Sequence, residues 1–357
     1  MTKDRQTTRI VISIAVSLFF LYLTFFKPHI GAIFRGEEGL FRALFSHGRF
    51  NLAELWQAMA TAHWIYIVAV GALYMLGLAL RAWRWHLLLP RGTLNYGQSF
   101  AAMMVGYMAN NLLPLRMGEL YRAQVVWQMC GLSRSAALGT IVLERTLDLF
   151  FFLPFIAGAM LLYPLPSALK TAGITGAVVI LCLVVFLIWM VFQRQQAMSA
   201  IQSMLSVLPL RFRDKAIALF DKFTIGLSAL RDLKLCLRLT VYSLALWIVY
   251  SVVMYLMLLA MDLMGPDTPN IAKDPLAASL VLLVITTIGF VTPSAPGAVG
   301  TYHGVTVLGL SLFGVPGDEA AGFAILLHAM NFLPLTGIGL FYFWQQGLSF
   351  RKPTETE

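Results

Sequence analysis

The stretch NNLLPLRMGELYRA, residues 110–123, combines a helix break with three charged side chains in an otherwise apolar region. Pro114 and Gly118 interrupt a helix, and Arg116, Glu119 and Arg122 follow three residues apart. If a helix begins directly after Pro114, these three side chains lie on one of its faces. Proline suits the first turn of a helix, because the N–H that it lacks has no intrahelical partner there. The stretch therefore predicts a broken helix whose second half presents its charges to a polar surface.

The rest of the sequence is much more apolar than that of a soluble domain. Hydrophobic residues make up 59% of the 357 residues and charged residues only 12%, about half the charged fraction of soluble proteins. Several apolar runs approach the roughly 20 residues that cross a bilayer as a helix. We therefore predict an all-α polytopic membrane protein, with residues 1–357 forming a single membrane domain. The net charge of +9 fits the orientation signal of membrane proteins, so we expect no nucleic-acid partner.

Full crossings are predicted at roughly six stretches, at residues 9–26, 62–80, 136–163, 172–192, 237–262 and 320–345. Basic residues flank them so that both termini are expected on the cytoplasmic side of the membrane. Residues 193–236 are interpreted as a cytoplasmic amphipathic linker or as an ordinary helical connection. Arg81, Arg84 and Trp85 are predicted to anchor the protein at headgroup level, with headgroup binding as the alternative.

Two further apolar regions, about 97–130 and 276–313, are broken in the middle and are predicted to be re-entrant helical hairpins. Non-helical backbone at membrane depth is tolerated only where protein or a water-filled cavity surrounds it. We therefore expect a polar cavity between the two hairpins. The residues assigned to the breaks are Asn110, Asn111, Pro114, Gly118, Pro293, Pro296, Gly297 and Gly300.

The two broken regions also resemble each other. Pro114 and Gly118 recur as Pro296 and Gly300, and later residues recur at offsets of 182 to 184. The first hairpin is expected to open to the cytoplasm and the second to the outside, so residues 62–163 and 237–345 are predicted to be inverted repeats. Inverted repeats with broken helices are typical of transporters, which bind substrate at the repeat interface.

The ionisable residues near the breaks are the candidate binding residues. The start of a half-helix presents free N–H groups, and the two arginines beside it could bind a phosphate. For Glu119 and Arg145 the sequence leaves ligand contact and a structural ion pair equally open, whereas for Asp148 an ion pair is favoured. A histidine that titrates near neutral pH could couple transport to protons, although hydrogen-bonded core histidines are the commoner case. The candidate set is Arg116, Glu119, Arg122, Glu144, Arg145, Asp148, His303 and His328.

These motifs resemble the lysylphosphatidylglycerol synthase transmembrane-region family. The segments that carry the resemblance are RAWRW (81–85), NNLLPLRMGELYRA (110–123), GLSRSAALGTIVLERTLD (131–148), PSAPGAVG (293–300) and AILLHAMNF (324–332). The resemblance implies a prokaryotic cytoplasmic-membrane protein that moves aminoacylated, polyprenyl-phosphate or hopanoid-type lipids between leaflets. The sequence departs from the family at two positions, since His303 and His328 stand where the family commonly has a glutamate and an arginine. We expect no soluble aminoacyl-transferase domain after residue 345.

The leading hypothesis is a lipid flippase or transporter for a phosphate-bearing lipid, expected to have an anionic headgroup. Two alternatives are a membrane-embedded enzyme that modifies the headgroup and a scaffold for a lipid-modifying enzyme. No nucleotide-binding or hydrolase motif is present, and the three cysteines have no metal spacing. We therefore expect a non-enzymatic protein without a cofactor or a metal.

Overall fold

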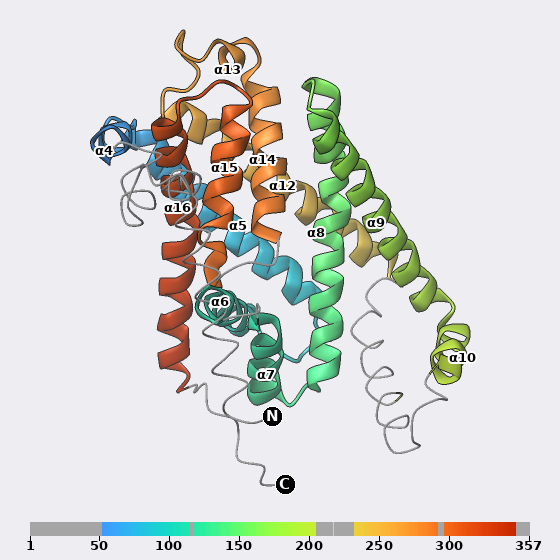
Figure 1. The fold of residues 1–357 in the computed structure, drawn as a ribbon. Coiled ribbons are helices and arrows are strands. Elements are labelled where there is room, and N and C mark those ends of the chain that lie inside the picture. The colour runs from blue at the N-terminus through green and yellow to red at the C-terminus, as the bar shows by residue number, and fades with distance from the viewer. Residues whose placement is uncertain (1–51, 114–116, 205–216, 218–231, 292–295, 348–357) are drawn as a thin grey trace, which may run out of the picture.

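A computed structural model describes residues 52–113, 117–204, 217, 232–291 and 296–347, which form helices and no strand (Figure 1). The helices, labelled as in Figure 1, are α4 (Leu52–Ala60), α5 (Trp64–Leu88), α6 (Tyr96–Leu112), α7 (Gly118–Cys130), α8 (Arg134–Leu162), α9 (Ser167–Phe192), α10 (Arg194–Met204), α12 (Leu233–Ala260), α13 (Pro269–Lys273), α14 (Pro275–Val291), the short 3₁₀ turn η4 (Pro296–Ala298), α15 (Thr301–Ser311) and α16 (Gly317–Gln345).

Five of these helices, α5, α8, α9, α12 and α16, are long and apolar enough to span a membrane within the described residues. They coincide with five of the six predicted crossings. The sixth prediction, residues 9–26, lies outside the described residues, as does most of the predicted linker between residues 205 and 231. Helix α5 continues to Leu88, beyond its predicted end at residue 80, and this extension carries Arg81, Arg84 and Trp85 into the interior.

Helices α5 and α12 pack against each other at the centre of the molecule. A Cβ atom added to Gly77 would lie 3.4 Å from the Tyr250 ring, so the two backbones come close at this point. Helix α5 also contacts α6 and α16, helix α12 also contacts α14, and α8 contacts both members of the pair. The α5–α12 pair therefore forms the frame against which the polar residues of α8 are placed.

Helices α6 and α7 form the first hairpin, and their backbones touch at two glycines. A Cβ atom added to Gly118 would lie 2.0 Å from the carbonyl oxygen of Gly106, so only glycine fits. Helix α6 begins at a capping box of Asn95 and Gln98, which satisfies N–H groups at the helix start. Helix α7 begins at Gly118 and not directly after Pro114. Arg116 lies outside the described residues, so its predicted place on one helical face with Glu119 and Arg122 stays a prediction.

Helices α14 and α15 form the second hairpin. Gly289 packs on Val305 and Gly309 on Ile285, which is the pairing of two antiparallel helices. The turn between them uses Gly297 and Gly300 at φ values of 65° and 86°, a region that favours glycine. Of the predicted break residues, Pro114 and Pro293 lie outside the described residues.

The tips of the two hairpins meet. A Cβ atom at Gly297 would lie 3.5 Å from the carbonyl oxygen of Asn111, and α6 contacts η4. Asn111 also donates from Nδ2 to Thr336 Oγ1 of α16 at 2.8 Å. In Figure 1 the α14–α15 hairpin occupies the upper half of the molecule and the α6–α7 hairpin the lower half. The broken segments therefore approach each other from opposite ends.

Candidate functional site

A cavity of about 370 Å³ lies where the hairpin tips, α5, α8 and α12 converge. Both hairpins line it, as expected from the two helix breaks. Its charged lining residues come from the first half of the chain, whereas the second half contributes aromatic, aliphatic and uncharged polar residues. The charged lining residues are Arg81, Glu119, Arg145 and Asp148.

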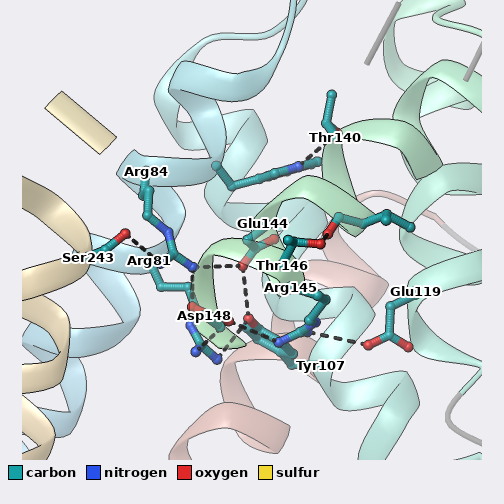
Figure 2. A network of polar contacts seen from close by, with 12 residues as sticks. Arg81, Arg84, Tyr107, Glu119, Thr140, Glu144, Arg145, Thr146, Asp148 and Ser243 are labelled. Carbon is teal, nitrogen blue, oxygen red and sulfur yellow. Dashed lines mark hydrogen bonds and ion pairs between the residues drawn. The ribbon is translucent and has the colours of Figure 1, made fainter. Parts of the chain in front are cut away.

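The most accessible ion pair in this lining joins α7 to α8. Arg145 Nη2 lies 3.3 Å from Glu119 Oε1, and the two side chains are 33% and 30% exposed. Arg145 also lies 3.6 Å from Asp148 and 5.3 Å from the centroid of the Tyr107 ring. Asn110 Nδ2 donates to the same Glu119 oxygen at 3.3 Å. The Arg145–Glu119 pair therefore connects the tip of the first hairpin to a membrane-spanning helix (Figure 2).

Asp148 forms ion pairs with two arginines of α5. Arg81 contacts Asp148 Oδ2 at 3.0 Å and donates to the Tyr107 hydroxyl at 3.1 Å. Arg84 donates to Asp148 Oδ1 and to Ser243 Oγ of α12 at 3.0 Å. Figure 2 shows these guanidinium groups converging on Asp148. The structure therefore places Asp148 in ion pairs with α5, and Asp148 also lines the cavity.

The predicted interfacial anchor was wrong for Arg84 and Trp85, whose side chains are fully buried. An anchor must reach the headgroups, but Arg84 is neutralised inside the protein by Asp148. Trp85 donates from Nε1 to Thr140 Oγ1 of α8 at 3.1 Å. Their spacing of three residues places Arg81 and Arg84 on one face of α5, where one carboxylate can accept from both.

Arg122 and Glu144 form a second buried ion pair. Their closest atoms, Arg122 Nη1 and Glu144 Oε2, are 2.7 Å apart, and the Arg122 guanidinium lies 3.5 Å from the centroid of the Trp85 ring. Neither residue belongs to the cavity lining. Breaking such a pair would leave an uncompensated buried charge. In the structure these two predicted binding residues therefore hold α7 against α8.

His303 and His328 pack against each other beside the second hairpin break, with ring centroids 4.8 Å apart. His328 Nε2 donates to the carbonyl oxygen of Gly297 at 2.9 Å. His303 Nδ1 accepts from the Gly300 N–H at 3.3 Å. Neither histidine lines the cavity. Their hydrogen bonds satisfy backbone groups that the break exposes, so the structure places them as supports of the turn.

The polar residues around Asp148 form one network, which we call the charged cluster. Its members are Arg81, Arg84, Glu119, Arg122, Glu144, Arg145 and Asp148. The cluster has one more arginine than carboxylates. An unbalanced positive charge inside a membrane protein is costly unless a negative group approaches it. The predicted residue Arg116 lies outside the described residues, and this balance counts described residues only.

Sequence reasoning missed Tyr107 and Tyr250 as parts of this site. Arg81 lies 5.7 Å from the centroid of the Tyr107 ring and 5.8 Å from that of Tyr250. Both tyrosines line the cavity. Their signal in the sequence is weak, because aromatic residues within apolar spans are common. Only the positions of α6 and α12 relative to Arg81 reveal the contact.

These features define a multi-pass, all-helical integral membrane protein with a charged cavity between two helical hairpins. The sequence matches the family described as "Lysylphosphatidylglycerol synthase TM region" over residues 10–339, and the chain belongs to this family.

Two relatives are both described as "UPF0104 membrane protein" and come from Methanothermobacter thermautotrophicus (strain ATCC 29096 / DSM 1053 / JCM 10044 / NBRC 100330 / Delta H). One is 25% identical over 307 residues, covering 80% of this chain and 87% of the relative. The other is 23% identical over 295 residues, covering 80% and 85%. No solved structure matches this chain.

Proposed function

We propose that this protein transports a phosphate-bearing lipid between the leaflets of a prokaryotic cytoplasmic membrane. The observation that carries the proposal is the cavity between the hairpin tips, which is lined by Arg81 and Arg145 within a cluster that has an excess positive charge. Membership of the "Lysylphosphatidylglycerol synthase TM region" family supports a lipid as the ligand. The headgroup would enter the cavity while the acyl or polyprenyl tail stays in the bilayer.

The depth of the cavity suits this role. Asp148 is the middle residue of α8, which runs from Arg134 to Leu162, so it lies about 21 Å from each end of the helix. If α8 spans the bilayer, the charged cluster lies near the middle of a hydrocarbon core about 30 Å thick. Transporters place their substrate sites at this depth, because the site must be reachable from either side in turn.

The two halves of the chain have matching elements, which supports an inverted repeat. Helices α6 and α14 are each 17 residues long, and α8 and α16 are each 29 residues long. Gly131 and Gly314, which precede α8 and α16, both have left-handed backbone, with φ values of 72° and 81°. In the proposal each hairpin is re-entrant from one side of the membrane, and the halves move relative to each other around the shared cavity.

Glu119 is the carboxylate that an incoming phosphate would replace. It is the most exposed acid of the charged cluster, and it holds the accessible guanidinium of Arg145. A phosphate oxygen can make the same charge-assisted hydrogen bonds to arginine as a carboxylate does. Replacement would free Glu119 from α8 and thereby loosen the tip of the first hairpin. Lipid binding and hairpin movement are coupled in this way.

The test is leaflet exchange in liposomes that contain the purified full-length protein and labelled lipids. We expect exchange of a phosphate-bearing lipid, with the recovered lipid chemically unchanged by mass spectrometry. Arg145→Gln should slow exchange at least about tenfold, the loss expected for one charge-assisted contact. Arg134→Gln is the matched control, because Arg134 lies over Trp127 outside the cavity lining.

Two results would count against the proposal. If folded protein exchanges none of the lipid classes tested, transport is excluded. A chemically altered lipid would instead indicate a headgroup-modifying enzyme.

A further inference from the structure

The cavity contains a second set of polar groups, which the charged cluster does not use. We call Tyr74, Trp247, Tyr250, Tyr302 and Asn331 the neutral polar cluster, and all five line the cavity. The Trp247 side chain is only 4% exposed, and its Nε1 has no hydrogen-bond partner among the described residues. Among the same residues, no hydrogen bond is made by the three tyrosine hydroxyls or by the Asn331 amide.

These groups lie together although they come from four helices. The Trp247 and Tyr250 rings are 5.9 Å apart, and Tyr74 and Tyr302 line the same cavity. Tyr302 stacks on His328 of α16, and Asn331 is three residues after His328 on the same helix. The buried Trp247 N–H has no partner among the described residues, which costs free energy, and the other four groups line the same cavity. Together these uncharged polar groups indicate a ligand with several uncharged oxygen atoms.

An aromatic cavity could also hold an ammonium group, because aromatic faces attract cations. Here the aromatic rings nearest the charged cluster already have an arginine guanidinium over their faces. Arg81 lies over the rings of both Tyr107 and Tyr250, and Arg145 lies over Tyr107. A ligand cation on these faces would be repelled by two guanidinium groups. The arrangement therefore favours an uncharged group next to a phosphate.

We propose that the neutral polar cluster is a subsite for an uncharged, hydroxyl-rich headgroup, such as a glycerol, inositol or sugar ring linked to the lipid phosphate. This inference rests on the proposed function, since Arg81 and Arg145 are taken to hold the phosphate. The indole N–H of Trp247 and the Asn331 amide donate to headgroup hydroxyl oxygens, and the tyrosine hydroxyls donate or accept. Arg81, in contact with Tyr250, joins the two subsites.

The experiment compares lipids that share a phosphate and differ in the group attached to it. Full-length protein in detergent is titrated with phosphatidic acid, phosphatidylethanolamine, phosphatidylglycerol and phosphatidylinositol, and each Kd is measured by native mass spectrometry. We expect the two polyol lipids to bind about threefold to tenfold more tightly than the other two, as one or two net hydrogen bonds provide.

Two variants test the assignment to particular atoms. Trp247→Phe keeps an aromatic ring against Phe152, on which Trp247 stacks at 5.0 Å, and removes the N–H donor together with part of the indole ring. Tyr302→Phe removes one hydroxyl. Each should reduce the preference for polyol lipids at least about twofold and leave phosphatidic acid binding unchanged. Trp189→Phe, on α9 and outside the cavity lining, is the matched control and should leave the preference intact.

The outcomes separate this subsite from the proposed function. If phosphatidic acid binds in an Arg145-dependent way but the polyol lipids gain nothing, the subsite is overturned and the phosphate site stands. A preference for phosphatidylethanolamine also overturns the subsite, in favour of an ammonium-binding cavity. If none of the four lipids binds to folded protein, both proposals are overturned.

Discussion

At the scale of single residues, one carboxylate contacts three of the four arginines of the charged cluster. Asp148 accepts from Arg81 and Arg84 of α5 and lies 3.6 Å from Arg145. A buried ion pair contributes little net stability over an apolar pair, but removing one partner is strongly destabilising. The importance of Asp148 therefore lies in the effect of its loss, which would leave Arg81 without its ion-pair partner and Arg84 with only Glu144, at 3.9 Å.

Asp148→Asn should lower the thermal unfolding temperature of the detergent-solubilised protein. The expected loss is about 3–5 kcal/mol of unfolding free energy, because the substitution removes the carboxylate charge and leaves its arginine partners buried. Asp262→Asn is the control: Asp262 is exposed and has a φ of 54°, a conformation that asparagine tolerates. Equal unfolding temperatures for the two variants would show that Asp148 does not neutralise the arginines of α5.

Glu119→Gln tests whether Glu119 competes with the ligand. Glutamine keeps an oxygen for Asn110 but loses the charge that holds Arg145. We therefore expect phosphatidic acid to bind about threefold to tenfold more tightly to this variant, in a titration monitored by native mass spectrometry. Glu319→Gln, in the first turn of α16 and outside the cavity lining, is the control. Weaker binding to Glu119→Gln would show that Glu119 supports the ligand site instead.

At the scale of elements, both hairpins depend on glycines at their helix contacts. Gly118 faces the backbone of Gly106, and Gly289 faces Val305. A side chain at these contacts would separate the two helices of a hairpin. Such close approach is common between membrane helices, where small residues let backbones pack. The positions of the glycines therefore set how tightly each hairpin closes and where its tip meets the other.

Gly118→Ala should open the first hairpin, because the added Cβ atom would lie 2.0 Å from the carbonyl oxygen of Gly106. We expect a loss of about 1–3 kcal/mol in unfolding free energy, as overpacking usually costs. Gly176→Ala is the matched control on α9, where an added Cβ atom has no neighbour within 4 Å. There alanine should be neutral or stabilising by about 0.5–1 kcal/mol. Similar unfolding temperatures for both variants would contradict the close contact.

At the scale of the whole molecule, the proposed mechanism requires the two hairpins to open toward opposite sides of the membrane. The connection that precedes α6 includes the exposed Arg91, and the connection that precedes α14 includes the exposed Asp267. If the repeats are inverted, these two connections lie on opposite faces of the bilayer. The positive charges near the first connection predict that it is the cytoplasmic one.

Cysteine labelling tests this arrangement directly. Arg91→Cys and Asp267→Cys are each placed in a variant that lacks Cys130, Cys182 and Cys236, and a membrane-impermeant thiol reagent is added to intact cells. We expect Asp267→Cys to react and Arg91→Cys to react only after the membrane is permeabilised. Labelling of both positions from the same side would rule out the inverted arrangement and, with it, the proposed alternating access.

The fold class and the location of the breaks could be predicted from the sequence alone. Apolar runs of sufficient length predict helices, because backbone groups in lipid must be satisfied within the segment. The pairs Pro114–Gly118 and Pro296–Gly300 marked where two of these runs turn back. Five predicted crossings coincide with long apolar helices, and the cavity between the hairpins lies where the breaks indicated.

Only the tertiary structure decided which charges pair and which face the cavity. Arg84 meets Asp148 64 residues away and Ser243 159 residues away, and no local pattern encodes contacts at such separations. Arg122 and Arg145 are both candidate binding residues in the sequence, yet one is locked in a buried pair and the other is open to the cavity. The physical reason is that desolvation depends on every helix packed around a charge, whereas the sequence shows only the neighbours along one helix.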